Sequence, residues 1–151
     1  MTDIIIGGDA FRVALTPQGV SQIEFARPDE VRPTALTGLA ALVARQLEEY
    51  LAGRRREFEL PVDLSECTPF HRQVLETLAQ VPWGHLVSYG ELARRVGRPG
   101  AARAVGGAMA HNPVPILIPC HRVVRGDGSP GGFTSGLDWK RRLLRTEGIV
   151  Y

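Results

Sequence analysis

Cysteine and long apolar runs are both scarce in this sequence, and each scarcity excludes a class of protein. Only Cys67 and Cys120 occur among the 151 residues, which argues against a disulfide scaffold and against a cysteine-rich zinc site. No apolar run approaches the roughly 18 residues that a membrane-spanning helix needs, and the segment Met1–Gly7 lacks the features of a signal peptide. We therefore expect a cytoplasmic protein with free thiols, no membrane contact, no metal and no cofactor.

Positive charge is sparse in the first half of the chain and concentrated in the second. Residues 81–151 contain ten Lys and Arg against four Asp and Glu, a net charge of +6, whereas residues 1–80 have eight against twelve, a net charge of −4. A basic half suggests a polyanionic partner, of which nucleic acid is the commonest. Solvated surface charge is the alternative interpretation at this point.

The first third of the chain predicts a small α/β domain. Short apolar or alternating runs at Ile4–Ile6, Phe11–Leu15 and Gly19–Phe25 are separated by turn residues, as in an antiparallel meander. Apolar residues then recur every three or four positions from Thr37 to Leu51, which predicts an amphipathic helix. No group of catalytic side chains occurs here, so we expect residues 1–64 to form a scaffold domain.

Residues 65–151 predict a second, mainly helical domain. A helix start is indicated at Thr68–Pro69, where a capping residue precedes proline. A capping box at Ser88–Glu91 opens a short helix. After a turn at Gly97–Gly100, a further helix is expected from Ala101 to Ala110, and such a pair is typical of a helix-turn-helix.

The second helix of this pair consists almost entirely of small residues, with Arg103 as its one long polar side chain. A helix that reads the major groove of DNA needs several side chains that reach base edges. Gly106 and Gly107 each cost a helix about 1 kcal/mol relative to Ala, so a close neighbour should compensate. Tight core packing and close approach to a minor groove both remain open here.

The segment Asn112–Val124 contains the most informative chemistry, because Cys120 is followed by His121. A buried cysteine is usually inert, but a nearby base makes a thiol nucleophilic. Prolines exclude a regular central strand, so we expect a buried, extended segment. Neighbours in an extended chain point to opposite faces, which predicts a water relay between Cys120 and His121, with Glu147 orienting the imidazole.

At these residues the chain resembles the O6-alkylguanine-DNA alkyltransferases, also called methylated-DNA–protein-cysteine methyltransferases. The similar motifs follow one another in the family's order between Thr68 and Ile149. They are Val87–Tyr89, Leu92–Ala93, Ala102–Gly106, Asn112–Pro115, Pro119–Val123, Leu143–Leu144 and Glu147–Gly148. The first 60 residues resemble the family only in their general layout.

The resemblance implies both a fold and a function. The fold is an α/β N-terminal domain, a small antiparallel sheet plus a helix, followed by a mainly α C-terminal domain with a winged helix-turn-helix. The function is direct-reversal DNA repair by a stoichiometric, suicide methyltransferase, which moves the alkyl group of O6-alkylguanine to its own cysteine. O4-alkylthymine is a further candidate substrate. The partner is duplex DNA, bound through the minor groove by a monomer that rotates the damaged base into a pocket.

The resemblance also implies roles for individual residues of the reaction centre. Cys120 is the nucleophile, His121 takes its proton through water, and Glu147 holds His121. Asn112 braces this network and the turn around it. Tyr89 contacts the DNA and forms a hydrogen bond with the extruded guanine, which favours departure of a neutral base.

The remaining implied residues contact DNA or surround the base. Arg103 fills the space that the guanine leaves in the stack, and Ala102 and Gly106 lie against the duplex. The base pocket is lined by Val123, Gly132, Phe133, Thr134 and Ser135. Family members often have Tyr and Ser where this chain has Phe133 and Thr134, so the polarity of the pocket is an open point.

Two other classes of function compete with repair. A non-catalytic lesion-binding or transcriptional module would explain the helix-turn-helix but would leave Cys120 and His121 without a role. A thiol hydrolase would explain that pair but not Arg103 on its Gly/Ala helix. Alkyl transfer accounts for all of these features together.

Overall fold

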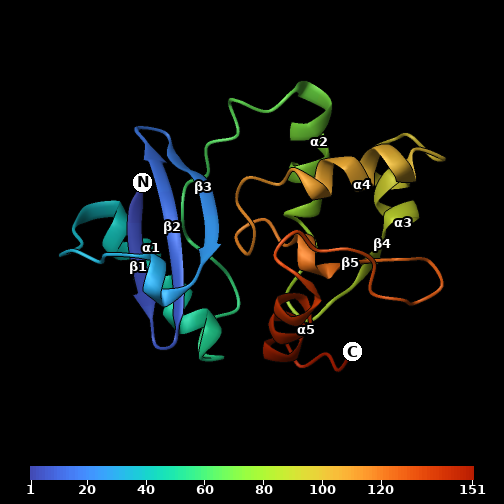
Figure 1. Ribbon diagram of the computed structural model, residues 1–151. Coiled ribbons are helices and arrows are strands. Elements are labelled where there is room, and N and C mark those ends of the chain that lie inside the picture. The colour runs from blue at the N-terminus through green and yellow to red at the C-terminus, as the bar shows by residue number, and fades with distance from the viewer. The chain divides into compact units, whose positions relative to one another are not determined.

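Three strands form an antiparallel meander at the start of the chain, in a computed structural model that describes residues 1–151 (Figure 1). The strands β1 (Thr2–Ile6), β2 (Asp9–Thr16) and β3 (Gly19–Ala26) are arranged with β2 in the middle. Their alternating apolar residues face the core, where Ile4, Phe11, Val13, Val20 and Ile23 are buried. A short 3-10 turn, η1 (Pro28–Glu30), follows.

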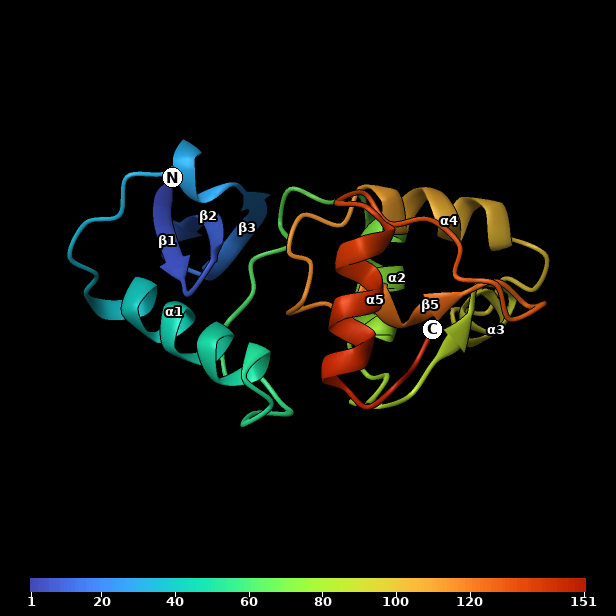
Figure 2. The ribbon, with the colours of Figure 1, turned by 60° about the horizontal axis from the view of Figure 1, so that its bottom comes forward.

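The helix α1 (Gly38–Leu51) packs on β1 and β2 (Figure 2). Its apolar stripe buries Val43, Leu47 and Tyr50. Gln46 is buried as well and exchanges two hydrogen bonds with the backbone of Glu59, accepting from its N–H at 2.9 Å and donating to its carbonyl at 3.3 Å. The predicted meander and helix are therefore both present.

Residues 65–151 form a second compact unit, which follows a first unit of residues 1–64. Its helices α2 (Pro69–Leu78), α3 (Tyr89–Arg95) and α4 (Ala102–Ala110) pack on one another in pairs. An α/β unit followed by a mainly helical one is the architecture that the sequence predicted. The wing of the predicted helix-turn-helix stays a prediction.

Two predicted caps start helices of this unit. Thr68 Oγ1 accepts the His71 N–H at 3.2 Å, and Ser88 Oγ accepts the Glu91 N–H at 3.0 Å. The Glu91 carboxylate binds the guanidinium groups of two arginines one turn along α3. Only the serine half of the predicted capping box therefore forms, because the arginines draw the carboxylate away from the helix start.

The last elements hold the segment that contains the cysteine and histidine. The strands β4 (Val87–Ser88) and β5 (Val123–Val124) pair in parallel, and the 3-10 turn η2 (Cys120–Arg122) directly precedes β5. The helix α5 (Leu137–Thr146) packs on η2 (Figure 2). None of the helices combines the length and the apolar character of a membrane span.

Candidate active site

Cys120 lies at the start of the 3-10 turn η2, and not on the extended chain that the sequence predicted. The Cys120 N–H donates to the Ile118 carbonyl at 2.8 Å, and the Arg122 N–H donates to the Pro119 carbonyl at 2.9 Å. Prolines cannot donate backbone hydrogen bonds, so this proline-rich segment folds into successive turns. The expectation that Cys120 and His121 point to opposite faces rested on an extended chain, and the 3-10 turn shows that this premise is wrong.

Asn112 holds the turn that leads to the cysteine. Its side-chain nitrogen donates to the Ile118 carbonyl at 2.9 Å, and its side-chain oxygen accepts the Val114 N–H at 3.1 Å. Within this turn Ile116 is buried with a φ of 73°, a conformation that costs a β-branched residue about 1–3 kcal/mol. These contacts hold the turn before Cys120, and a role of Asn112 in bracing the network of His121 and Glu147 stays a prediction.

The environment of Cys120 keeps its sulfur protonated at rest. The residue is 8% exposed, and burial raises the pKa of the Cys120 thiol to about 11. A hydrogen bond from Asn112 and the positive charge of Lys140 act in the opposite direction. Since the thiolate and not the thiol is the nucleophile, this cysteine needs a base.

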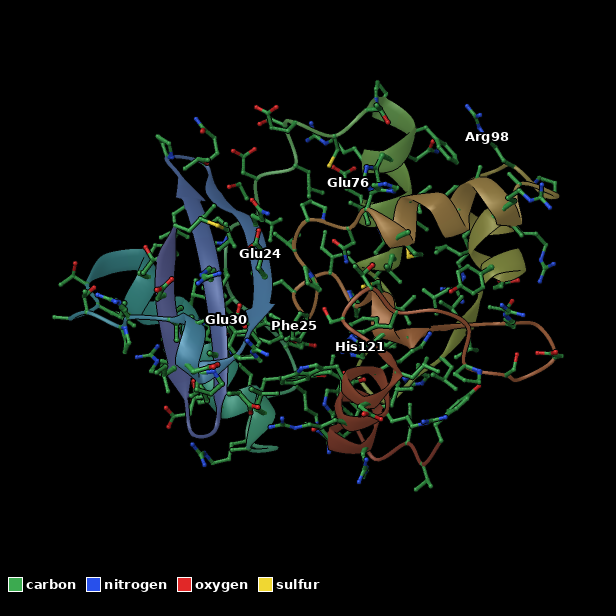
Figure 3. All side chains as sticks on the ribbon, viewed as in Figure 1. Glu24, Phe25, Glu30, Glu76, Arg98 and His121 are labelled. Carbon is green, nitrogen blue, oxygen red and sulfur yellow. The ribbon has the colours of Figure 1, made fainter.

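His121, Arg122 and Glu147 form a buried ionic network next to the cysteine. His121 Nε2 lies 2.7 Å from Glu147 Oε2, and the Arg122 guanidinium contacts both carboxylate oxygens at 2.9 Å. The Gly84 N–H adds a hydrogen bond to Glu147 at 3.0 Å, and Arg122 also donates to the Val81 carbonyl at 2.6 Å. His121 lies beside α5 (Figure 3).

Burial makes His121 a neutral base. Burial lowers the pKa of His121, although the Glu147 carboxylate acts in the opposite direction. An ionised carboxylate can only accept a hydrogen bond, so the proton of the neutral ring resides on Nε2. The other ring nitrogen, Nδ1, is buried and is the atom that can take up a proton.

A pocket of about 280 Å³ opens onto Cys120. It is lined by Tyr89, Gly106, Met109, Ala110, Cys120, Gly132, Phe133 and Thr134. Three of the predicted pocket residues, Gly132, Phe133 and Thr134, are in this lining, and the volume lies near the lower end of small-molecule sites, about 300 Å³.

Two predicted pocket residues do not line it. Val123 is fully buried in β5, where it pairs with Val87. Ser135 lies in the turn that the Gly136 N–H closes onto the Phe133 carbonyl at 2.9 Å. The strand pairing of Val123 and the turn around Ser135 place these two residues outside the pocket lining. Neither feature can be recognised from the sequence motif.

Tyr89 lies between helix α4 and the loop that follows β5. A Cβ atom at Gly131, whose φ is +72°, would lie 2.9 Å from the Tyr89 hydroxyl, so only glycine fits there. At Gly106 a Cβ atom would lie 3.9 Å from the Tyr89 ring, which is ordinary contact. Burial raises the pKa of Tyr89, so its hydroxyl stays protonated and can donate a hydrogen bond.

An open groove of about 480 Å³ adjoins the pocket. It is lined by Tyr89, Ala102, Arg103, Gly106, Arg125 and Gly132, three of which also line the pocket. The predicted DNA-contacting residues Ala102, Arg103 and Gly106 thus lie together, and Arg103 is exposed. A Cβ atom at Gly107 would meet nothing within 4 Å, so core packing does not explain that glycine.

Several residues of the site were given no role from the sequence, among them Arg122, Arg125 and Lys140. Arg122 directly follows the Cys-His pair, and Arg125 lies three positions further along the chain. Lys140 is fully buried on α5, on the same face as the buried Leu143 and Leu144. A lysine on an apolar helical stripe is a signal that could have been recognised. No group of three or more His, Cys, Asp and Glu side chains could hold a metal ion.

Comparison with known proteins identifies relatives of this chain. The family described as 6-O-methylguanine DNA methyltransferase, DNA binding domain, matches residues 69–149. A methylated-DNA–protein-cysteine methyltransferase of Mycolicibacterium paratuberculosis is 44% identical over 115 residues, 76% of this chain and 67% of the relative. One of Mycobacterium bovis is 46% identical over 102 residues, 68% of this chain and 61% of the relative.

A solved structure is similar over most of the chain. Mycobacterium tuberculosis OGT in complex with DNA superimposes with a TM-score of 0.85 and 34% identity, covering 97% of this chain and 92% of that one. The matches to the two curated relatives span roughly two thirds of their length, 67% and 61%. With more than half of its residues matched to the family, this chain belongs to the 6-O-methylguanine DNA methyltransferases.

Proposed function

We propose that this protein repairs DNA by moving the alkyl group of O6-alkylguanine to its own Cys120. One observation carries the proposal: a thiol opens onto a pocket of about 280 Å³, and a buried, neutral histidine oriented by a carboxylate follows it in the chain. The names of the relatives, methylated-DNA–protein-cysteine methyltransferase, support the same reaction. In this proposal residues 65–151 perform the chemistry and residues 1–64 are the scaffold.

The reaction is a single displacement at the alkyl carbon. The Cys120 sulfur forms a bond to this carbon while the bond from carbon to guanine O6 breaks, and the electron pair remains on the guanine. The thiol proton passes through water to His121 Nδ1, and Glu147 stabilises the imidazolium. At a pKa of about 11, roughly one thiol in ten thousand is ionised at pH 7, so this proton transfer is essential.

Tyr89 and Asn112 assist the same step in different ways. The Tyr89 hydroxyl, protonated because burial raises the pKa of Tyr89, donates a hydrogen bond to the extruded guanine and stabilises the leaving base. Asn112 holds the turn before Cys120 and contributes a hydrogen bond that favours the thiolate. Neither residue takes the alkyl group.

Duplex DNA is the proposed partner, bound by one monomer through the minor groove. The small residues of α4 allow the helix to approach a narrow groove closely. Arg103 projects from the exposed part of α4 that lines the groove beside the pocket, where it can occupy the space that the rotated base leaves. The solved relative that was crystallised with DNA supports this partner.

The reaction ends with a form of the protein that cannot react again. A thioether at Cys120 is neither a thiolate nor a disulfide, so thiol exchange cannot release the alkyl group. Cys67, the other cysteine, lies before α2 and outside the pocket lining. Each molecule is therefore consumed by one repair event.

The experiment that tests this function is a titration against excess duplex containing O6-methylguanine, followed by peptide mass analysis. We expect one methyl group per protein, found on the Cys120 peptide and absent from the Cys67 peptide. A product yield well above one equivalent would mean turnover, and a methyl group elsewhere would mean a different nucleophile. Either result would contradict the proposal.

The role of Arg103 is tested by comparing paired and single-stranded substrates. Arg103→Ala should slow repair of duplex DNA by about 10-fold or more, a loss on the scale of one charge-assisted contact, and should affect single strands less because they have no stack to fill. Arg141→Ala, which removes an exposed arginine of α5, is the matched control. An equal loss on both substrates would reduce Arg103 to a phosphate contact.

A further inference from the structure

Lys140 is a buried cation that the proposed reaction does not yet use. It projects from α5 with no exposed surface. Its Nζ donates to the Val123 carbonyl at 2.6 Å, to the Gly132 carbonyl at 3.2 Å and to the Pro130 carbonyl. An ammonium group has three N–H donors, so these carbonyls engage all of them.

The three carbonyls belong to β5 and to the loop that forms one wall of the pocket. Val123 directly follows η2, which contains Cys120. Pro130 and Gly132 flank Gly131, the glycine at which a Cβ atom would lie 2.9 Å from the Tyr89 hydroxyl. Lys140 thus ties the strand that follows the nucleophile to the loop that contacts Tyr89.

Lys140 also provides positive charge at the nucleophile. Two titratable side chains interact electrostatically with Cys120, Tyr89 from α3 and Lys140 from α5, and His121 follows Cys120 in η2. At neutral pH only the lysine is cationic, because burial lowers the pKa of Lys140 to about 8 and lowers that of His121 as well. The nearby Arg122 is paired with Glu147 through two contacts.

We propose that Lys140 is a positioning residue for alkyl transfer, whose ammonium group fixes the pocket loop against β5 and stabilises the thiolate that forms on Cys120. The inference rests on the proposed function, because it assigns a further residue to the same site. Its charge acts through space, since its three hydrogens are already donated to carbonyls.

Three substitutions separate the two contributions of Lys140. Lys140→Arg keeps the charge and the donors, Lys140→Gln keeps two N–H donors without the charge, and Lys140→Met removes both. Arg145→Gln, which removes an exposed charge from the same helix, is the matched control. Thermal unfolding followed by circular dichroism establishes which variants are folded, and if Lys140→Met is not, the Gln and Arg variants decide.

The decisive readout is the rate at which iodoacetamide labels Cys120 between pH 6 and pH 10, measured by peptide mass with Cys67 as internal reference. We expect Lys140→Gln to label Cys120 about 3- to 10-fold more slowly at pH 7, since loss of a nearby charge of opposite sign raises a thiol pKa by about half a unit to one unit. Lys140→Arg should remain within about twofold of the wild type, a difference of a few tenths of a pKa unit.

Alkyl transfer from a methylated duplex is measured in parallel. It should fall at least as much as labelling in Lys140→Gln and further in Lys140→Met, where the loop also loses its donors. Unchanged Cys120 labelling and unchanged transfer in a folded Lys140→Gln protein would overturn the inference. If the wild type labels normally but transfers no methyl group, the proposed function fails while the labelling comparison still tests Lys140.

Discussion

The two units of this chain differ most in what they bury. The core of residues 1–64 contains one buried polar side chain, Gln46, and that side chain is uncharged. The core of residues 65–151 contains four polar side chains with ionisable groups, His121, Arg122, Lys140 and Glu147, in addition to the thiol of Cys120. Burial of a charge is costly unless the charge is paired and hydrogen-bonded, and each of these four has such partners.

This difference indicates that residues 65–151 contain buried groups whose role is chemical and not stabilising. Well-packed apolar residues in place of a buried ion pair are often neutral or stabilising, so stability alone does not explain the network around Glu147. The same unit also contains the strained Ile116 and the buried thiol of Cys120, and strain of this kind clusters at functional sites. In residues 1–64 the polar pairing has a simpler purpose, namely satisfying the backbone of Glu59.

The largest expected effect on alkyl transfer comes from substitution of the cysteines, which compares the buried reactive thiol with a thiol outside the pocket. Cys120→Ser should abolish alkyl transfer, because a serine hydroxyl is a far weaker nucleophile than a thiolate, while binding to a methylated duplex is retained. Cys67→Ser, at a partly exposed position outside the pocket, should change transfer little. Transfer and DNA binding are measured on both variants. Residual transfer by Cys120→Ser would show that another group accepts the alkyl.

The next largest effect is expected at the carboxylate of the network. Glu147→Gln leaves the Arg122 charge buried without a counterion, which should lower the free energy of unfolding by about 3–5 kcal/mol. It also removes the group that stabilises the imidazolium, so transfer by the folded protein should fall about 100-fold or more. Urea unfolding and single-turnover rates measure the two losses.

Glu76→Gln provides the matched control for Glu147→Gln. Glu76, labelled in Figure 3, lies on α2. It forms an ion pair with Arg72 at 2.7 Å, and about half of each side chain is accessible. Exposed pairs of this spacing contribute about 0.3–0.5 kcal/mol, so both stability and transfer should remain close to the wild type. Equal losses in the two variants would remove the distinction between buried and exposed charge.

The sequence predicts the parts of this molecule that depend on local patterns. Alternation and turn residues locate the meander, three- and four-residue spacing locates α1, and Thr68 and Ser88 start their helices as expected. The pairing of His121 with Glu147 was expected from the need of an imidazole for a carboxylate and from the family resemblance. These features depend on neighbours in the sequence or on a motif.

Other parts of the site depend on backbone atoms that are distant in the sequence. The turn at Cys120 differs from the expected extended chain because prolines remove donors and Asn112 closes the loop before it. Lys140 donates to three backbone carbonyls, and the sequence cannot show which ones because every residue has a carbonyl. The positions of Val123 and Ser135 away from the pocket likewise follow from main-chain pairing and turn geometry.

A moderate effect is expected when pH is lowered. Because burial lowers the pKa of His121 below its usual 6.5, the imidazole should remain a neutral base as the pH falls through 6.5, and the acid limb of the transfer rate should lie below that value. The unfolded chain binds this proton more readily than the folded one, so the free energy of unfolding should decrease as the pH falls below 6.5. Transfer rates and urea unfolding between pH 8 and pH 5 test both statements. An acid limb of the transfer rate above pH 6.5 would refute the assignment of His121 as the base.

The smallest expected effect on stability is that of a substitution in residues 1–64, and its result could contradict the functional distinction between the two units. Gln46→Ala removes both hydrogen bonds to the Glu59 backbone and leaves a small void beside α1. It should lower the free energy of unfolding by about 1–2 kcal/mol, the usual loss for such a pair of bonds. Transfer per folded molecule should not change, because no group of this unit enters the proposed reaction. Urea unfolding measures the loss of stability, and single-turnover kinetics measure the transfer rate. Gln22→Ala on β3 is the control for a less buried glutamine, because the Gln22 side-chain amide forms a hydrogen bond only with the side chain of Glu24. A reduced transfer rate in fully folded Gln46→Ala protein would mean that residues 1–64 influence the reaction itself, and their role as a scaffold would then have to be abandoned.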